Sequence, residues 1–109
     1  MLYLSHILDA IREIEGFIEG KSGEEVFNDH TVYYGMLYML AVIGEASGNL
    51  SVSCKERYSE IAWQDVKDMR NILIHEYFDV SFDIVWKTVK ERLPELKQVV
   101  EKAIAEGSV

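Results

Sequence analysis

Apolar side chains recur every three or four residues along most of the chain, a spacing that predicts amphipathic helices. In the first helix, predicted over residues 4–18, charged residues fill the opposite face, and the apolar positions are Leu4, Ile7, Leu8, Ile11, Ile14 and Ile18. Gly20 and Gly23 predict the end of this helix. Residues 21–28 are therefore expected to form a connection.

A second helix is predicted to begin at Asp29 or Thr31, because either side chain can cap a helix, and to end at Gly48-Asn49. Residues 32–43 contain no charged side chain, so this helix is expected to be buried on more than one side. Residues 51–58 are predicted to be a loop, with a short helix over residues 55–61 as the alternative.

The third predicted helix covers residues 63–78 and is followed by a turn at residues 79–81. Ser81 is expected to cap a last helix that continues to residue 104. We expect Pro94 to kink that helix, because proline has no backbone N–H to donate.

Four amphipathic helices with short connections predict an all-α fold, an antiparallel four-helix bundle formed by a single domain over residues 1–109. A short extra helix before the third long one would be an addition to this bundle. The second and third helices carry more apolar surface than one core needs, which indicates a homodimer. The alternative is that the segment over residues 55–61 covers that surface.

Composition narrows the functional classes. The chain has 109 residues and a net charge of −8, which argues against a general nucleic-acid binder and leaves room only for a local site. A single cysteine excludes an internal disulfide. The sequence shows neither a signal peptide nor a run of about 20 apolar residues, so we expect a cytoplasmic protein with no membrane partner.

Metal and thiol chemistry are not indicated. The three histidines, His6, His30 and His75, lie on different segments and none has a second histidine at helical spacing, so no metal site and no cofactor are predicted. Cys54 falls in a predicted loop near Lys55 and Arg57. These cations could activate the thiol, but an ordinary loop thiol is the simpler interpretation.

The remaining polar cluster is on the third helix, where Arg70, Asn71, His75 and Tyr77 lie within two turns. A guanidinium matches a phosphate, and histidine transfers protons near neutral pH. On an ideal helix Arg70 and His75 are about 140° apart, so they meet only if the arginine bends, the helix distorts or a second subunit contributes. The alternative is structural: an arginine–carboxylate pair, a histidine at a helix end and a core tyrosine. Glu45, beside the apolar run of the second helix, would be the partner of Arg70 in that pair.

The segment from Trp63 to Val80 resembles the signature of the HepT-like toxins of the HEPN superfamily. Met69-Arg70-Asn71 and His75-Glu76-Tyr77-Phe78 carry this resemblance. Residues 8–14, 43–47, 82–86 and 93–96 resemble other parts of the same family, so the similarity covers nearly the whole chain. Unlike many members of the family, the chain has no basic residue shortly before Ile43 and no proline just before Trp63.

The resemblance implies a dimeric helical bundle that acts as a metal-independent endoribonuclease, the toxin of a toxin–antitoxin pair. By position, Arg70 and His75 match the catalytic pair, and Asn71 matches the polar residue after the arginine. Tyr77 matches the tyrosine that a minimal nucleotidyltransferase antitoxin modifies with AMP, and Glu45 is a supporting residue. The alternative is a non-catalytic module that binds a nucleotide or the nucleotidyltransferase.

Overall fold

The computed structural model describes residues 2–75 and 81–107, with side chains described for residues 2–70 and 81–107. Within these ranges every regular element is a helix, which confirms the predicted all-α class. The elements are α1 (Leu2–Ile18), α2 (Gly23–Asn28), α3 (His30–Gly48), α4 (Val52–Arg57), α5 (Trp63–His75), α6 (Phe82–Lys87), the π-helical turn η2 (Thr88–Arg92) and α7 (Leu93–Ala105).

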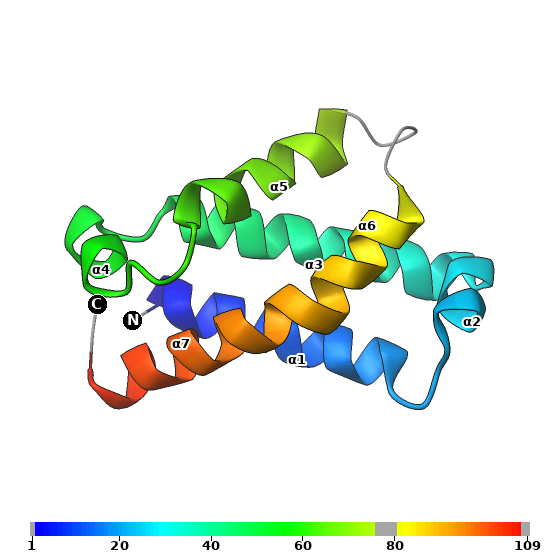
Figure 1. Ribbon diagram of the computed structural model, residues 1–109, viewed down its shortest axis with the longest axis horizontal. Coiled ribbons are helices and arrows are strands. Elements are labelled where there is room, and N and C mark those ends of the chain that lie inside the picture. The colour runs from blue at the N-terminus through cyan, green and yellow to red at the C-terminus, as the bar shows by residue number, and fades with distance from the viewer. Residues whose placement is uncertain (1, 76–80, 108–109) are drawn as a thin grey trace.

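The long helices form an antiparallel bundle (Figure 1). Helix α3 packs against both α1 and α5, and α1 also packs against α7. Each of these pairs runs in opposite directions, as in an antiparallel bundle. Helix α5 therefore lies at one edge of the bundle, with α3 as its main support.

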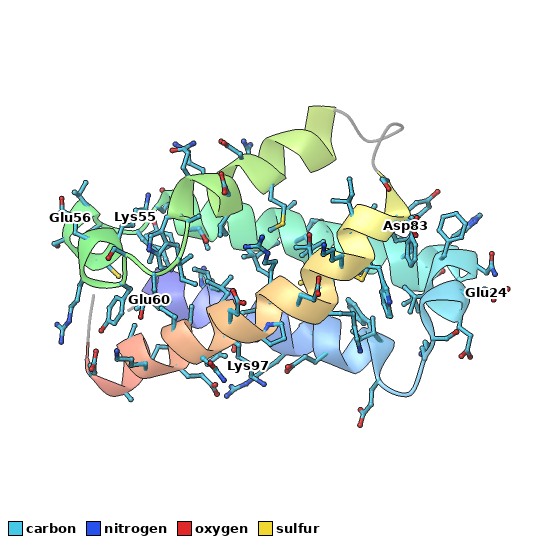
Figure 2. All side chains as sticks on the ribbon, in the orientation of Figure 1. Glu24, Lys55, Glu56, Glu60, Asp83 and Lys97 are labelled. Carbon is cyan, nitrogen blue, oxygen red and sulfur yellow. The ribbon has the colours of Figure 1, made fainter. Side chains whose placement is uncertain are left out.

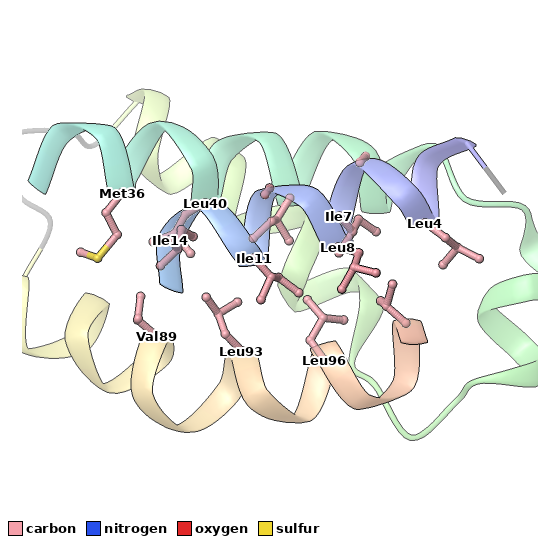
Figure 3. Packing of buried hydrophobic residues seen from close by; sticks show 14 of the residues in the cluster. Leu4, Ile7, Leu8, Ile11, Ile14, Met36, Leu40, Val89, Leu93 and Leu96 are labelled. Atoms are coloured by element: carbon pink, nitrogen blue, oxygen red, sulfur yellow. The ribbon is translucent and has the colours of Figure 1, made fainter. Parts of the chain in front are cut away.

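The core lies between α1, α3 and the last helical segment (Figure 3). All six predicted apolar positions of α1 are on its inner face, and all but Ile18 are buried. Met36, Leu40 and Ile43 reach them from α3, while Leu93, Leu96 and Val100 reach them from α7. The helical spacing of these residues is thus explained by one shared core.

The prediction that residues 21–28 form a connection is wrong for most of the segment, because Gly23–Asn28 is helix α2. Ser22 caps it: its hydroxyl accepts a hydrogen bond from the Glu25 backbone N–H at 3.1 Å, and the Glu25 carboxylate accepts one from the Ser22 N–H at 3.0 Å. This reciprocal capping box is a recognised helix start. The two glycines obscured it in the sequence.

The loop predicted over residues 51–58 is also wrong, since Val52–Arg57 is helix α4. A short helix does precede α5, but it begins before the residue range 55–61 considered as the alternative. Ser51 sets the start, because its hydroxyl accepts a hydrogen bond from the Cys54 N–H at 3.1 Å. Cys54 is therefore a buried thiol on a helix rather than a residue of an exposed loop.

The last helical segment accommodates Pro94 through a wider turn. Proline leaves the carbonyl four residues earlier without its usual donor. Just before it, the Leu93 N–H donates to the Thr88 carbonyl, five residues back, which defines η2. The helix continues through α7, so the expected disturbance at Pro94 takes the form of a π-turn. Ser81 occupies the N-cap position of α6, but its side chain makes no capping hydrogen bond.

Some apolar surface on α3 remains exposed. The side chains of Tyr34 and Tyr38 are 47% and 66% exposed, so α4 does not cover this part of the helix. The homodimer stays a prediction. Among the described residues, no helix combines the length and the apolar character needed to cross a membrane.

Candidate functional site

Helix α5 carries Arg70 and is anchored at its start by Trp63. The indole of Trp63 is buried, and its Nε1 donates to the Tyr58 carbonyl at 3.0 Å. Further along, Val66 and Met69 are half-buried against the core. Arg70 follows directly, so the packing of its neighbours places it at the α3–α5 contact.

Gly44 brings the two helices close together at this point. A β-carbon at Gly44 would lie 2.9 Å from the Arg70 Cβ and 3.0 Å from both the Arg70 backbone nitrogen and the Val66 carbonyl oxygen. The distance to the Arg70 Cβ is shorter than real Cβ atoms show, and the two backbone distances are unusually tight, so a side chain here would require the two helices to shift. The backbone of Arg70 therefore rests directly on α3.

Glu45, the next residue along α3, forms an ion pair with Arg70. The Arg70 Nε lies 2.7 Å from the Glu45 Oε2, which is a close ion pair. The side chains are 42% and 60% exposed, so solvent reaches both groups. The arginine–carboxylate pair suggested by the sequence is present, and it leaves the guanidinium accessible.

A shallow cleft of about 170 Å³ opens beside this pair. Its lining residues are Gly44, Glu45, Gly48, Asn49, Lys67 and Arg70. Lys67 lies one helical turn before Arg70, and its side chain packs over Gly48. The cleft thus has two cations on one wall and one carboxylate on the other.

Lys67 and Asn49 line the cleft although neither was predicted as a site residue. The three-residue spacing from Lys67 to Arg70 is the signal that could have identified the lysine. Asn49 gave no such signal, because it was interpreted only as the end of a helix. In the structure its Nδ2 donates to the Glu45 carbonyl at 2.9 Å, which fixes the end of α3 beside the cleft.

The other predicted site residues are described less fully. Asn71 and His75 belong to α5, but their side chains lie outside the described residues. Tyr77 lies outside the described ranges altogether. The expected meeting of Arg70 with His75 is therefore a prediction. Among the described residues no three histidine, cysteine, aspartate or glutamate side chains gather as a metal site.

The basic residues of the last helical segment are largely engaged in contacts of their own. Lys97 is labelled on α7 in Figure 2. Its Nζ donates to both carboxylate oxygens of Glu15 at 3.0 Å. Lys87 lies 4.0 Å from Glu91, and Lys90 and Lys102 lie over aromatic rings. None of these four lysines lines the α3–α5 cleft, whose two cations are Arg70 and Lys67.

Comparison with known proteins places this geometry in a family. The family model described as "Ribonuclease HepT-like" matches residues 7–103. A protein of Thermococcus cleftensis named "Probable ribonuclease HepT" is 40% identical over 92% of this chain and 91% of its own length. One from Caldanaerobacter subterraneus, named as a "Putative RNase", is 34% identical over 94% of this chain and 91% of its own.

A relative from Methanocaldococcus jannaschii is named "Gamma-glutamylcyclotransferase and putative RNase". It is 34% identical over 96% of this chain, which spans only 47% of that longer protein. The search of solved structures gave no match. The family match covers most of the chain and includes most of α1 and the whole of α3 and α5, and on this evidence the protein belongs to the HepT-like ribonuclease family.

Proposed function

We propose that this protein is a metal-independent endoribonuclease that acts in the cytoplasm as the toxin of a toxin–antitoxin pair. The proposal rests on Arg70, which belongs to the family's motif. Its guanidinium lies at the edge of the cleft, and the side chain is 42% exposed. A planar guanidinium with permanent charge suits the phosphate of an RNA backbone.

In the proposed reaction, Arg70 binds the scissile phosphate and stabilises the negative charge that develops on it. His75 transfers a proton from the attacking ribose 2′-OH or to the leaving oxygen. Asn71 adds a polar contact beside the arginine. Because Arg70 and His75 diverge on an ideal helix, we propose that the site is completed across a homodimer interface.

The exposed face of α3 supports such a dimer. Tyr34, Tyr38 and Glu45 lie within about 60° of one another around the helix, so the exposed aromatic surface leads to the Glu45–Arg70 pair. A second copy on this face would bring two Arg70 side chains together. Light scattering of the wild type and of Tyr38→Glu measures this: we expect a dimer that the substitution dissociates, and a monomeric wild type would refute it.

Cleavage of RNA by the purified protein, in the presence of a chelator, tests the activity. We expect the wild type to cut and Arg70→Ala and His75→Ala each to lose at least about 100-fold in rate. Arg92→Ala is the matched control, because it removes an exposed arginine from η2 without touching the cleft. An inactive wild type, or equal rates in all variants, would exclude the nuclease and favour the non-catalytic binding module.

The proposed antitoxin is a minimal nucleotidyltransferase that transfers AMP to the Tyr77 hydroxyl, with pyrophosphate leaving from ATP. The added nucleotide would repel RNA from the site by its charge and bulk. Mass spectrometry after co-expression with such an enzyme is expected to show one adenylyl group on wild type and on Tyr38→Phe, but none on Tyr77→Phe. Modification of both variants alike would refute the assignment to Tyr77.

A further inference from the structure

The closest contact between Glu45 and Arg70 is at one nitrogen of the guanidinium. The 2.7 Å contact joins Glu45 Oε2 to Nε, the nitrogen nearest the aliphatic chain. A guanidinium has a second hydrogen-bonding edge, formed by its two terminal nitrogens, and this edge binds a phosphate in two-point fashion. A carboxylate at Nε is therefore compatible with a phosphate at the far edge.

The backbone positions of Arg70 and Glu45 are fixed by helix packing, so their ion pair is more than a chance contact between two long side chains. Gly44 brings the Arg70 backbone onto α3, and Glu45 is the next residue. Asn49 bonds to the Glu45 carbonyl at 2.9 Å. An arginine that is nearly half exposed would otherwise sample many rotamers, and a fixed partner at Nε removes that freedom.

We infer that Glu45 is a positioning residue, which holds Arg70 through Nε so that the terminal nitrogens face the phosphate of bound RNA. This role rests on the proposed function of Arg70. It carries a cost in affinity, because the carboxylate also brings a negative charge close to an anionic substrate. Glu45 therefore favours turnover at the expense of binding.

Kinetics of RNA cleavage test this division. We expect Glu45→Ala to lower kcat by about 10- to 100-fold, since the guanidinium loses its fixed orientation, while KM stays the same or falls. Glu45→Gln keeps a polar oxygen in place beside Nε, so it should recover most of kcat. Arg70→Ala, in contrast, should lower kcat and also raise KM.

The matched control is Glu15→Gln, with Glu15→Ala beside it. Glu15 pairs with Lys97 at 3.0 Å on the α1–α7 side of the bundle, so its removal changes net charge and breaks an ion pair away from the cleft. These variants should cleave like the wild type. If the Glu45 variants match them, or if Glu45→Ala raises kcat, the positioning role is overturned.

A second measurement does not depend on cleavage. In nitrogen-15 NMR, the Arg70 Nε–H signal, assigned by its loss in Arg70→Lys, should exchange slowly with water in the wild type and in Glu15→Gln. It should exchange faster in Glu45→Ala. Adding an oligonucleotide with 2′-O-methyl riboses should shift the terminal nitrogens and leave the Nε–H protected.

These readouts separate the two proposals. If the wild type cuts no RNA while the Nε–H signal behaves as expected, the nuclease fails and the positioning of Arg70 stands. If the protein cuts RNA and the Nε–H signal is the same in wild type and Glu45→Ala, the nuclease stands and the positioning role is wrong. Loss of Nε protection when the oligonucleotide binds also overturns it, because phosphate would then displace Glu45.

Discussion

The hydroxyl of Ser47 lies completely buried in α3 and has no hydrogen-bond partner among the described residues. A buried polar group without a partner loses its hydrogen bonds to water and gains nothing in return. The residue lies on the inner side of the helix, four residues after Ile43, where an apolar residue is expected.

We predict that Ser47→Ala stabilises the protein by about 0.5–1.5 kcal/mol, because it removes the unsatisfied hydroxyl and places a better helix former in α3. Urea unfolding followed by circular dichroism measures the change. The control is Ser5→Ala on α1, where the side chain is only half-buried. It measures the contribution of helix propensity to the change in unfolding free energy. A destabilising Ser47→Ala would show that the hydroxyl has a partner after all.

At the start of α2, the capping box lowers the pKa of Glu25. The backbone N–H of Ser22 donates to its carboxylate, which favours the charged form, and the Ser22 side chain acts in the same direction. A lowered folded-state pKa means that this contact stabilises the helix at neutral pH and is lost as the pH falls through that pKa.

We therefore expect the Glu25 carboxyl, followed by carbon-13 NMR, to titrate below the ordinary pKa of a glutamate side chain. Ser22→Ala should raise its pKa part of the way back, since the backbone donor remains. Loss of the cap should also fray α2, with a cost of about 1 kcal/mol. Titration of Glu25 together with Glu24, which shares the first turn, would contradict this prediction.

At the scale of the elements, the packing of α5 on α3 depends on Gly44. Its missing side chain allows Arg70 and Val66 to approach within about 3 Å of where a β-carbon would be. Because α3 is the main support of α5, a change at this position moves the helix that carries the motif.

We predict that Gly44→Ala destabilises the fold by about 1–3 kcal/mol, because the methyl group collides with backbone atoms that cannot rotate away. It should also lower RNA cleavage by displacing Arg70 from Glu45. Gly16→Ala in α1 is the matched control, since a β-carbon there meets nothing within 4 Å. That variant should be stabilised by roughly 0.5–1 kcal/mol, and equal unfolding curves for the two variants would refute the packing argument.

At the scale of the whole molecule, the net charge of −8 disfavours the binding of RNA to the surface in general, so binding requires a local group of cations. The cations of the last helical segment are mostly paired or stacked on rings, whereas Lys67 and Arg70 line the cleft. Attraction for RNA is therefore concentrated on very few charges.

We predict weak RNA binding whose affinity falls as salt rises, with a slope of log affinity against log salt of roughly −1 to −2 per protomer. Fluorescence anisotropy with a 2′-O-methyl oligonucleotide, recorded between about 50 and 200 mM salt, measures this slope. Lys67→Ala should reduce it by about 0.7, and Arg92→Ala should leave it unchanged. Tight binding that is insensitive to salt would contradict the prediction.

The long helices could be predicted from the sequence because each has a strong local signal. The apolar spacing of α1, the Asp29 cap of α3 and the run from Trp63 all agree with the structure. Asp29 was one of two proposed caps, and its carboxylate accepts from the Val32 N–H at 3.3 Å. Helix α2 was not predicted, and α4 was expected only as an alternative with a later start, because six residues carry too little periodicity. The serine at the start of each helix is the clearest local signal for it.

The features of the candidate site also fall into two groups: those that local sequence predicted and those that only helix packing decided. Local sequence predicted that Arg70, Asn71, His75 and Tyr77 lie on one helix, and the resemblance gave them roles that remain proposals. The Glu45–Arg70 pair was suggested by charge and burial, but its atoms and distance come from the packing of α3 on α5. The spacing of Lys67 and Arg70 places both on one side of α5, but the cleft that they line together with the end of α3 had no local signal.

The sequence by itself determined the helical class, the positions of the long helices and the family motif, because these depend on spacing within one segment. Tertiary structure alone decided which surfaces meet: the approach at Gly44, the contact of Glu45 with Nε and the use of the last segment's lysines in contacts elsewhere. Such contacts join residues far apart in the chain. They depend on how whole helices pack, and helix periodicity carries no information about that arrangement.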